Sequence, residues 1–327
     1  MKEYFWALSP NPAQFIAITD FRTPLMMHAQ EKKYRHIFIN PTDIGGRFAA
    51  LSYFGLIPYA LMGGDVIALM EQAHTTHEVF STDSSNAAQT LTQRLFDHHQ
   101  AGRNKLYFEI APSFVNLRLW IEQLVAESTG KSGFGLLPVL SGAPHTDGFV
   151  ETIQIQKVED LAHEFLRWEC ATAMLGAMLK INPFDEPNVV QSKQNTTQFL
   201  QNDDCAQAVH SALQKTIVPL KDASRFIEDV HAPSFVAILN YTHQDLPIGL
   251  PKTCAVSHCR GPRYLHSTGQ YHKGGPNQGH FVVVVDEQKD LPIPGRPYGF
   301  QTLKLAQALG DYEALKATGR KVVMVQV

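Results

Sequence analysis

The sequence predicts an α/β protein with a largely parallel sheet. Short apolar runs alternate along the chain with amphipathic stretches long enough to form helices, which is the pattern of this class. Residues 15–19 form a continuous apolar run that ends at Asp20, as expected of a parallel strand buried on both faces. The chain has 327 residues, of which 44% are hydrophobic, so it can build one large core or two ordinary ones.

Local signals place the elements of the first half. Gly63 and Gly64 end a helix predicted over 47–61, and Asp65 caps the next helix, which runs through 73. Ser113 is the expected cap of a helix that continues to about 126. The other predicted elements of this half are a helix over 87–99 and strands over 105–110, 136–140 and 150–156.

The second half continues the alternation. The Asn-Pro-Phe-Asp stretch at 182–185 breaks a long apolar helix predicted over 158–179, and a further helix opens at Asn188. Strongly β-branched runs predict strands. The remaining predicted elements are strands over 236–241, 281–285 and 322–327 and a helix over 301–309. A polar stretch at 201–204 marks a plausible domain boundary near residue 200.

Composition and charge argue against several classes of protein. Lys and Arg number 28 against 31 Asp and Glu, so the chain lacks the basic excess that general nucleic-acid binding needs. No apolar run approaches ~18 residues, so no membrane span is predicted. The first six residues do not resemble a secretory signal. Four cysteines are too few for a disulfide scaffold, and we therefore expect a reducing, cytoplasmic setting.

Metal and nucleotide motifs are missing from the sequence. Cys254, His258 and Cys259 lack a second ligand pair at matching spacing, so we expect no structural zinc. Neither a P-loop nor a Gly-x-Gly-x-x-Gly turn after a strand occurs. We expect neither a metal nor an organic cofactor.

A pair of glycines precedes the first predicted helix. Gly45 and Gly46 could let the backbone approach a ligand, and Arg47 would add a fixed positive charge where a helix N-terminus already attracts anions. The alternative is an ordinary loop with a surface arginine, and spacing alone favours that alternative.

Two polar residues share one face of the helix predicted from 113. Gln123 and Glu127 are four residues apart, and Gly130 ends the helix, so Glu127 lies in the last turn where the helix dipole disfavours a carboxylate. Such a position tends to raise the pKa of the carboxyl, which suits a general base that works near neutral pH. The alternative is a solvated glutamate beside Lys131.

Two later segments could also carry chemistry. Pro183 and Pro187 frame a rigid turn into the helix that holds Lys193, although a helical lysine is usually solvated. Residues 263–276 concentrate cationic, polar and glycine residues without helical or strand periodicity, and His266 and Gln270 lie there. Binding groups gather in such loops, and the alternative is an ordinary polar loop.

Together these four segments resemble one family, the phosphoglucose isomerases (glucose-6-phosphate isomerases). The stretch 45–58 resembles its Gly-Gly-Arg segment, 123–131 resembles its Gln-x-x-x-Glu-Ser-x-Gly-Lys segment, and 182–193 resembles its Asn-Pro-Phe-Asp segment. The resemblance is nearest to the isomerase half of bifunctional transaldolase/phosphoglucose isomerases, and it includes 266–276 and 306–311.

The resemblance implies a fold. We expect a sugar-isomerase (SIS) α/β/α sandwich with a mostly parallel sheet over 1–200, corresponding to the second half of the isomerase. A C-terminal α/β lobe would follow over 201–327. The first SIS domain of the family, with its Ser/Thr-rich phosphate loop, would be absent.

The resemblance also implies roles for individual residues. Glu127 would carry a proton between C1 and C2 of glucose 6-phosphate and fructose 6-phosphate through a cis-enediolate, and Arg47 would stabilise the anion. Gly45, Gly46, Gln123 and Gln270 would bind the sugar. Lys193 and a histidine would open the ring. In most of the family that histidine lies between the glutamate and the lysine, so we hypothesise that His266 supplies it from a later position.

Three alternatives follow for the activity. The chain is expected to turn over weakly or not at all alone, and a second copy or a complementing isomerase or transaldolase chain would then complete it. Alternatively, it is a catalytically silent module that binds sugar phosphates. A third possibility is a different sugar-phosphate isomerase that uses the same groups.

Overall fold

The computed structural model describes residues 7–327, apart from the side chain of Val189. The six residues on which the expectation of no secretory signal rests therefore lie outside the described part. The chain divides into two compact units, each described by itself below. The first unit holds the described residues up to Asn86 together with 156–169, and the second holds 87–155 and 170–327.

The first unit contains a small parallel sheet. Strands β1 (Ile16–Asp20) and β2 (His36–Asn40) pair in parallel and are connected by helix α2 (Pro24–Glu31). Thr23 caps α2 by accepting a hydrogen bond from the backbone N–H of Met26 at 3.2 Å. Helices α3 (Tyr53–Leu61) and α4 (Val66–Thr82) follow. A small core around Leu69, Ala73 and Ala162 joins α4 to the first turns of α7 (Asp160–Met178), which contributes to both units.

The predicted helix over 47–61 is wrong in its first part. Residues Gly46–Phe48 form a single 3₁₀ turn, and α3 starts only after Ser52, whose hydroxyl accepts from the N–H of Phe54. A hydroxyl at that position satisfies an N–H that has no partner within the helix, so the α-helix begins there. The cap predicted at Ser113 is also wrong, because Pro112–Phe114 is a 3₁₀ turn and α6 (Leu117–Thr129) begins after Asn116.

The second unit contains two parallel sheets. The first sheet has the order β4-β3-β5, with β3 (Lys105–Ile110) between β4 (Leu137–Pro138) and β5 (Gly148–Ile153). The helices of this part are α5 (Ala87–Gln100), α6 and the second half of α7.

The second sheet has the order β7-β6-β8-β9, and all of its pairs are parallel. Its strands are β6 (Phe235–Asn240), β7 (Ala255–Arg260), β8 (Gly279–Val285) and β9 (Lys321–Gln326). The accompanying helices are α8 (Val189–Leu200), α9 (Cys205–Thr216), α10 (Leu220–Glu228), α11 (Gly269–Gly274) and α12 (Phe300–Ala317). Short 3₁₀ turns lie at Pro12–Gln14 and Arg263–His266.

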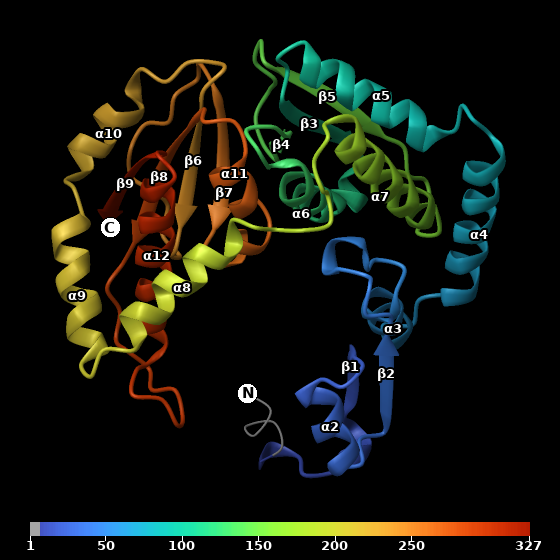
Figure 1. Cartoon of the computed structure of the whole chain (residues 1–327), viewed down its shortest axis with the longest axis horizontal. Coiled ribbons are helices and arrows are strands. Elements are labelled where there is room, and N and C mark those ends of the chain that lie inside the picture. The colour runs from blue at the N-terminus through green and yellow to red at the C-terminus, as the bar shows by residue number, and fades with distance from the viewer. Residues whose placement is uncertain (1–6) are drawn as a thin grey trace. The chain divides into compact units, whose positions relative to one another are not determined.

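Both faces of the second sheet are covered. One face of β6, with Phe235, Ala237 and Leu239, packs against side chains of α9 and α12. The opposite face, with Val236 and Ile238, packs against side chains of α10. Figure 1 shows the strands of this sheet with α9, α10 and α12 beside them. Burial on both faces explains why β6 is apolar along almost its whole length.

The predicted α/β class with mostly parallel sheets is confirmed. The SIS assignment and the missing first domain remain predictions. The predicted boundary near residue 200 falls inside the second compact unit, between α8 and α9, and also stays a prediction. Within residues 7–327 no helix combines the length and hydropathy needed to cross a membrane.

Candidate functional site

Helix α6 carries two of the predicted site residues on one face. Gln123 donates from Nε2 to Oε2 of Glu127 over 3.4 Å, as the four-residue spacing predicts. Glu127 lies in the last turn and only 7% of its surface is exposed. The amide thus orients a carboxylate that is almost entirely withdrawn from solvent.

The end of α6 touches the backbone of α11. A Cβ at Gly130 would lie 2.4 Å from Cα of Tyr271, so only glycine allows this approach. The next residue, Lys131, donates from Nζ to the carbonyl of Asn182 at 2.6 Å and pairs with the carboxylate of Asp185 at 3.0 Å. The Asn-Pro-Phe-Asp turn is therefore held against the end of α6.

Gln270 joins three of the motif segments. Its Nε2 donates to the carbonyl of Gly130 at 2.9 Å and to Oδ1 of Asn188 at 2.8 Å, and its Oε1 accepts from the N–H of Asn188 at 2.9 Å. The side chain is fully buried. Its amide is therefore engaged inside the protein, and the predicted direct contact with a sugar stays a prediction.

Lys193 and His266 line the same cavity. This cavity has a volume of about 370 Å³ and lies between α8, the 3₁₀ turn Arg263–His266 and α12. Both side chains are exposed, and Arg263 lines the cavity with them. The structure thus brings together the lysine and the histidine that the sequence separates by more than 70 residues.

A buried ion pair supports the wall of this cavity. Nζ of Lys273 lies 2.7 Å from Oδ1 of Asp311, and both side chains are almost fully buried. Ser192 on α8 and the hydroxyl of Tyr264 donate to the same carboxylate. Burial disfavours the charged carboxylate, but Lys273 and these hydrogen bonds outweigh it and lower the pKa of Asp311. The network ties α8, α11, α12 and the 3₁₀ turn together.

Sequence reasoning missed Glu122. This residue on α6 is buried, and desolvation raises the pKa of its carboxyl to about 7, against the opposing pull of Arg263. A pKa near neutrality is typical of groups that exchange protons in active sites. The sequence did hold a signal for its burial. Glu122 lies four residues before Ala126 and seven before Thr129, and residues at these spacings share one face of a helix, which is buried here.

Gly45, Gly46 and Arg47 lie in the first compact unit. Neither glycine has a positive φ, and a Cβ at either would meet nothing within 4 Å, so the backbone does not require glycine there. Arg47 is 5% exposed and lies in the 3₁₀ turn Gly46–Phe48. The predicted α-helix N-terminus at this position is therefore wrong. The juxtaposition of Arg47 with Glu127 stays a prediction.

The described residues offer no metal site. Within 7–327, no group of three or more His, Cys, Asp and Glu side chains has a geometry that could hold an ion. Cys254 and Cys259 are buried free thiols, and burial raises the pKa of both.

Comparison with known proteins gives partial matches. No protein-family model matches the chain. The glucose-6-phosphate isomerase of Streptococcus pyogenes is 34% identical over 110 residues, which cover 31% of this chain and 23% of that protein. The enzyme of Heliobacterium modesticaldum is 30% identical over 38% of this chain and 29% of its own length. The enzyme of Campylobacter jejuni is 33% identical over 42% of this chain and 35% of its own length.

The solved structures that match include a hypothetical protein from Thermus thermophilus, at 12% identity, 88% coverage of both chains and a TM-score of 0.28. The sequence matches with the curated relatives span between about a quarter and a third of their length. Over those stretches the chain is similar in sequence to glucose-6-phosphate isomerases, and this similarity supports an enzyme of the isomerase type.

Proposed function

We propose that this chain carries residues of a glucose-6-phosphate isomerase site and interconverts glucose 6-phosphate and fructose 6-phosphate. One observation carries the proposal: Gln270 ties the end of α6, which holds Glu127, to the start of α8, which holds Lys193. The partial similarity to named isomerases supports the same reaction class.

Glu127 is the proposed base. Its carboxylate removes the proton from C2 of the open-chain aldose, the electron pair forms a C1=C2 double bond, and charge moves onto O1. Return of the proton to C1, with transfer of the O2 proton to O1, gives the ketose. The carboxylate is nearly buried and held by Gln123, which fixes its direction.

A cation is needed where negative charge develops on oxygen, and Arg47 is the proposed source. Losing such a group typically costs about 3–4 kcal/mol in the barrier, or roughly 10²–10³ in rate. Gly45 and Gly46 are proposed to lie beside the sugar.

Lys193 and His266 are proposed to exchange the ring-oxygen and O1 protons that ring opening requires. Their place in one cavity supports that pairing. Gln123 and Gln270 are proposed to bind the sugar. Gln270 also joins the end of α6 to the start of α8 through its hydrogen bonds to Gly130 and Asn188. A second chain, either another copy or an isomerase or transaldolase chain, completes the site in this proposal, and the setting is cytoplasmic.

A coupled assay tests the proposal. Turnover of fructose 6-phosphate is measured for the wild-type chain, for Glu127→Gln and for Glu228→Gln, an exposed glutamate at the end of α10 that serves as control. We expect Glu127→Gln to lower kcat by at least about 10²-fold with little change in substrate binding, and the control to match wild type.

The assay is repeated with a complementing isomerase chain added. Measurable and equal turnover by wild type and Glu127→Gln in the presence of the complementing chain would overturn the role of Glu127. Substrate binding without turnover under either condition would instead favour a non-catalytic sugar-phosphate module. Faster turnover of pentose phosphates than of hexose phosphates would indicate a different isomerase.

A further inference from the structure

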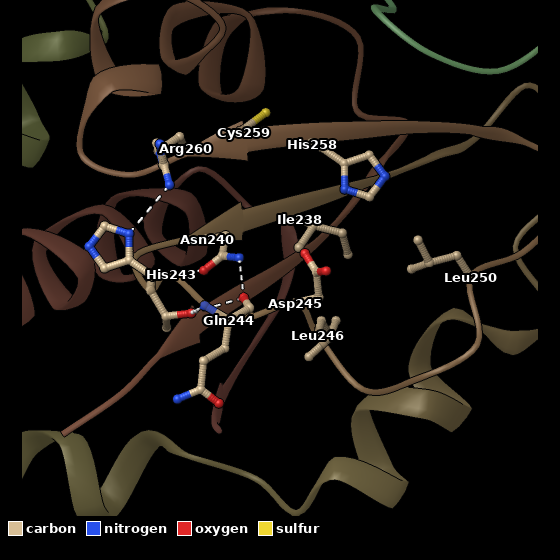
Figure 2. A pocket seen from close by; sticks show the side chains of 11 residues that line it. Ile238, Asn240, His243, Gln244, Asp245, Leu246, Leu250, His258, Cys259 and Arg260 are labelled. Carbon is tan, nitrogen blue, oxygen red and sulfur yellow. Dashed lines mark hydrogen bonds between the residues drawn. The ribbon is translucent and has the colours of Figure 1, made fainter.

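Two adjoining cavities in the second unit lie outside the site described above. The first has a volume of about 430 Å³ and lies at the carboxyl ends of β6 and β7 (Figure 2). The second has a volume of about 380 Å³ and is lined by residues 141–145 and part of 251–258. His258 lines both cavities, so they meet at that side chain. Each has the size of a small-molecule site.

The topology of the sheet opens the first cavity. The connection after β6 packs Leu246 and Leu250 on the face that α10 covers. The connections after β7 and β8 return over the opposite face, where Tyr264 and Leu305 are packed. Neighbouring strands whose connections leave over opposite faces create a crevice at their carboxyl ends, which is where open α/β sheets bind ligands.

The loop after β6 is held in one shape. The side chain of Asn240 accepts from the N–H of Thr242 and donates to the carbonyl of Gln244, both at 2.8 Å. These bonds, one of which is drawn in Figure 2, place His243 opposite Arg260, whose guanidinium lies 3.4 Å from Nδ1 of that ring. A cation and an imidazole are therefore presented together at the cavity wall.

The second cavity offers another cationic group. Lys252 and His145 line it, together with the Ser-Gly-Ala-Pro segment at 141–144. Lys252 is exposed and His145 is half-buried, so both can reach a ligand from solvent.

The side chains that line the two cavities are mainly cationic, although the whole chain carries a negative net charge. The side chains that are or can become cationic are Arg260, Lys252, His243, His258 and His145. Asp245 is the acidic residue of the two linings, whereas the whole chain carries a net charge of −3. The guanidinium of Arg260 in one cavity and the ammonium of Lys252 in the other suit two separate anionic groups.

We propose that the paired cavities bind one small organic bisphosphate. One phosphate lies against Arg260 and His243, the other lies against Lys252 and His145, and His258 lies between them. Ile238 and Leu250, which line the first cavity, contact the carbon skeleton. None of the residues proposed for isomerisation lines either cavity, so this binding is independent of the proposed reaction.

Isothermal titration of the full chain with a hexose 1,6-bisphosphate tests the proposal, with hexose 1-phosphate, which is not the proposed isomerase substrate, and inorganic phosphate as comparison probes. We expect the bisphosphate to bind at least about tenfold more tightly than the monophosphate. Arg260→Gln and Lys252→Gln should each raise Kd by at least tenfold, and Asp245→Asn should lower it. Arg225→Gln removes an exposed arginine on α10 and should leave Kd unchanged.

Two variants locate the bound probe. Lys193→Gln and Glu127→Gln should bind the bisphosphate as wild type does, because they alter only the proposed isomerase site. The proposal is overturned if Arg260→Gln retains wild-type affinity, if the monophosphate binds as tightly as the bisphosphate, or if Lys193→Gln alone abolishes binding. The substituted side chains at 252 and 260 are exposed, and circular dichroism confirms that the variants fold.

Discussion

Gln270 and Asn188 bind each other through two hydrogen bonds across 82 residues of sequence. The backbone N–H of Asn188 donates to Oε1 of Gln270, and Nε2 of Gln270 donates back to Oδ1 of Asn188. The same Nε2 reaches the carbonyl of Gly130 at the end of α6. One buried amide therefore sets where α6, α8 and α11 meet.

Replacing Gln270 by Leu should weaken this junction. The carbonyl of Gly130 and the polar groups of Asn188 would lose buried partners, and each such loss costs about 1–3 kcal/mol. We expect a lower midpoint in urea unfolding and a parallel loss of turnover. Gln93→Leu, at an exposed α5 position bonded only locally to Asp97, is the control. Wild-type stability in the Gln270 variant would show that the cross-link does not hold the junction.

Gly130→Ala should displace α11 from α6. The added Cβ would lie 2.4 Å from Cα of Tyr271 and 2.7 Å from the carbonyl oxygen of Ala126, closer than atoms can approach. Overpacking of this kind typically costs about 1–3 kcal/mol. Gly249→Ala, where a Cβ meets nothing within 4 Å, should leave the melting temperature unchanged. Equal melting temperatures for the two variants would contradict the close approach.

Glu122→Gln should stabilise the protein above neutral pH. Desolvation raises the pKa of the native carboxyl from 4.5 to about 7, so the folded chain holds a proton that the unfolded chain releases. Stability therefore falls as pH rises through that window, by at most on the order of 3 kcal/mol. Urea unfolding at pH 5 and pH 8 measures the difference. If wild type and variant change equally between the two pH values, the carboxyl does not carry a raised pKa.

Lys193→Met and His266→Gln should slow anomer exchange of glucose 6-phosphate. If these side chains open the ring, each change should lower the exchange rate measured by NMR by roughly 10²-fold, because proton transfer by a positioned side chain contributes about that much. His210→Gln, an exposed α9 histidine paired with Glu287, should exchange as wild type does. If both site variants exchange anomers as fast as wild type, the cavity that Lys193 and His266 line does not catalyse ring opening.

Several helix limits could not be read from residue patterns alone. The predicted cap at Asp65 is confirmed, because its side chain accepts a hydrogen bond from the N–H of Ala68, as the local rule requires. The predicted start of the helix at residue 47 is wrong. Residues compatible with a helix stand on both sides of Ser52, so the sequence does not distinguish Ser52 as the residue that caps α3. The raised pKa of Glu122 could not be recognised from the sequence, because burial of the carboxyl causes it and burial is set by packing between distant segments. Arg263 and Cys259, which interact with it electrostatically, also lie far away in the sequence.

The sequence by itself determined the α/β class, most strands and the identity of the chemical groups, because strand periodicity, caps and motifs are local properties of the chain. Only the tertiary structure decided that Lys193 and His266 share a cavity. It also decided that Gln270 is engaged inside the protein and that Arg260 and Lys252 line adjoining cavities. These relations depend on packing between distant segments, where burial and hydrogen bonding are set by side chains that no local pattern specifies.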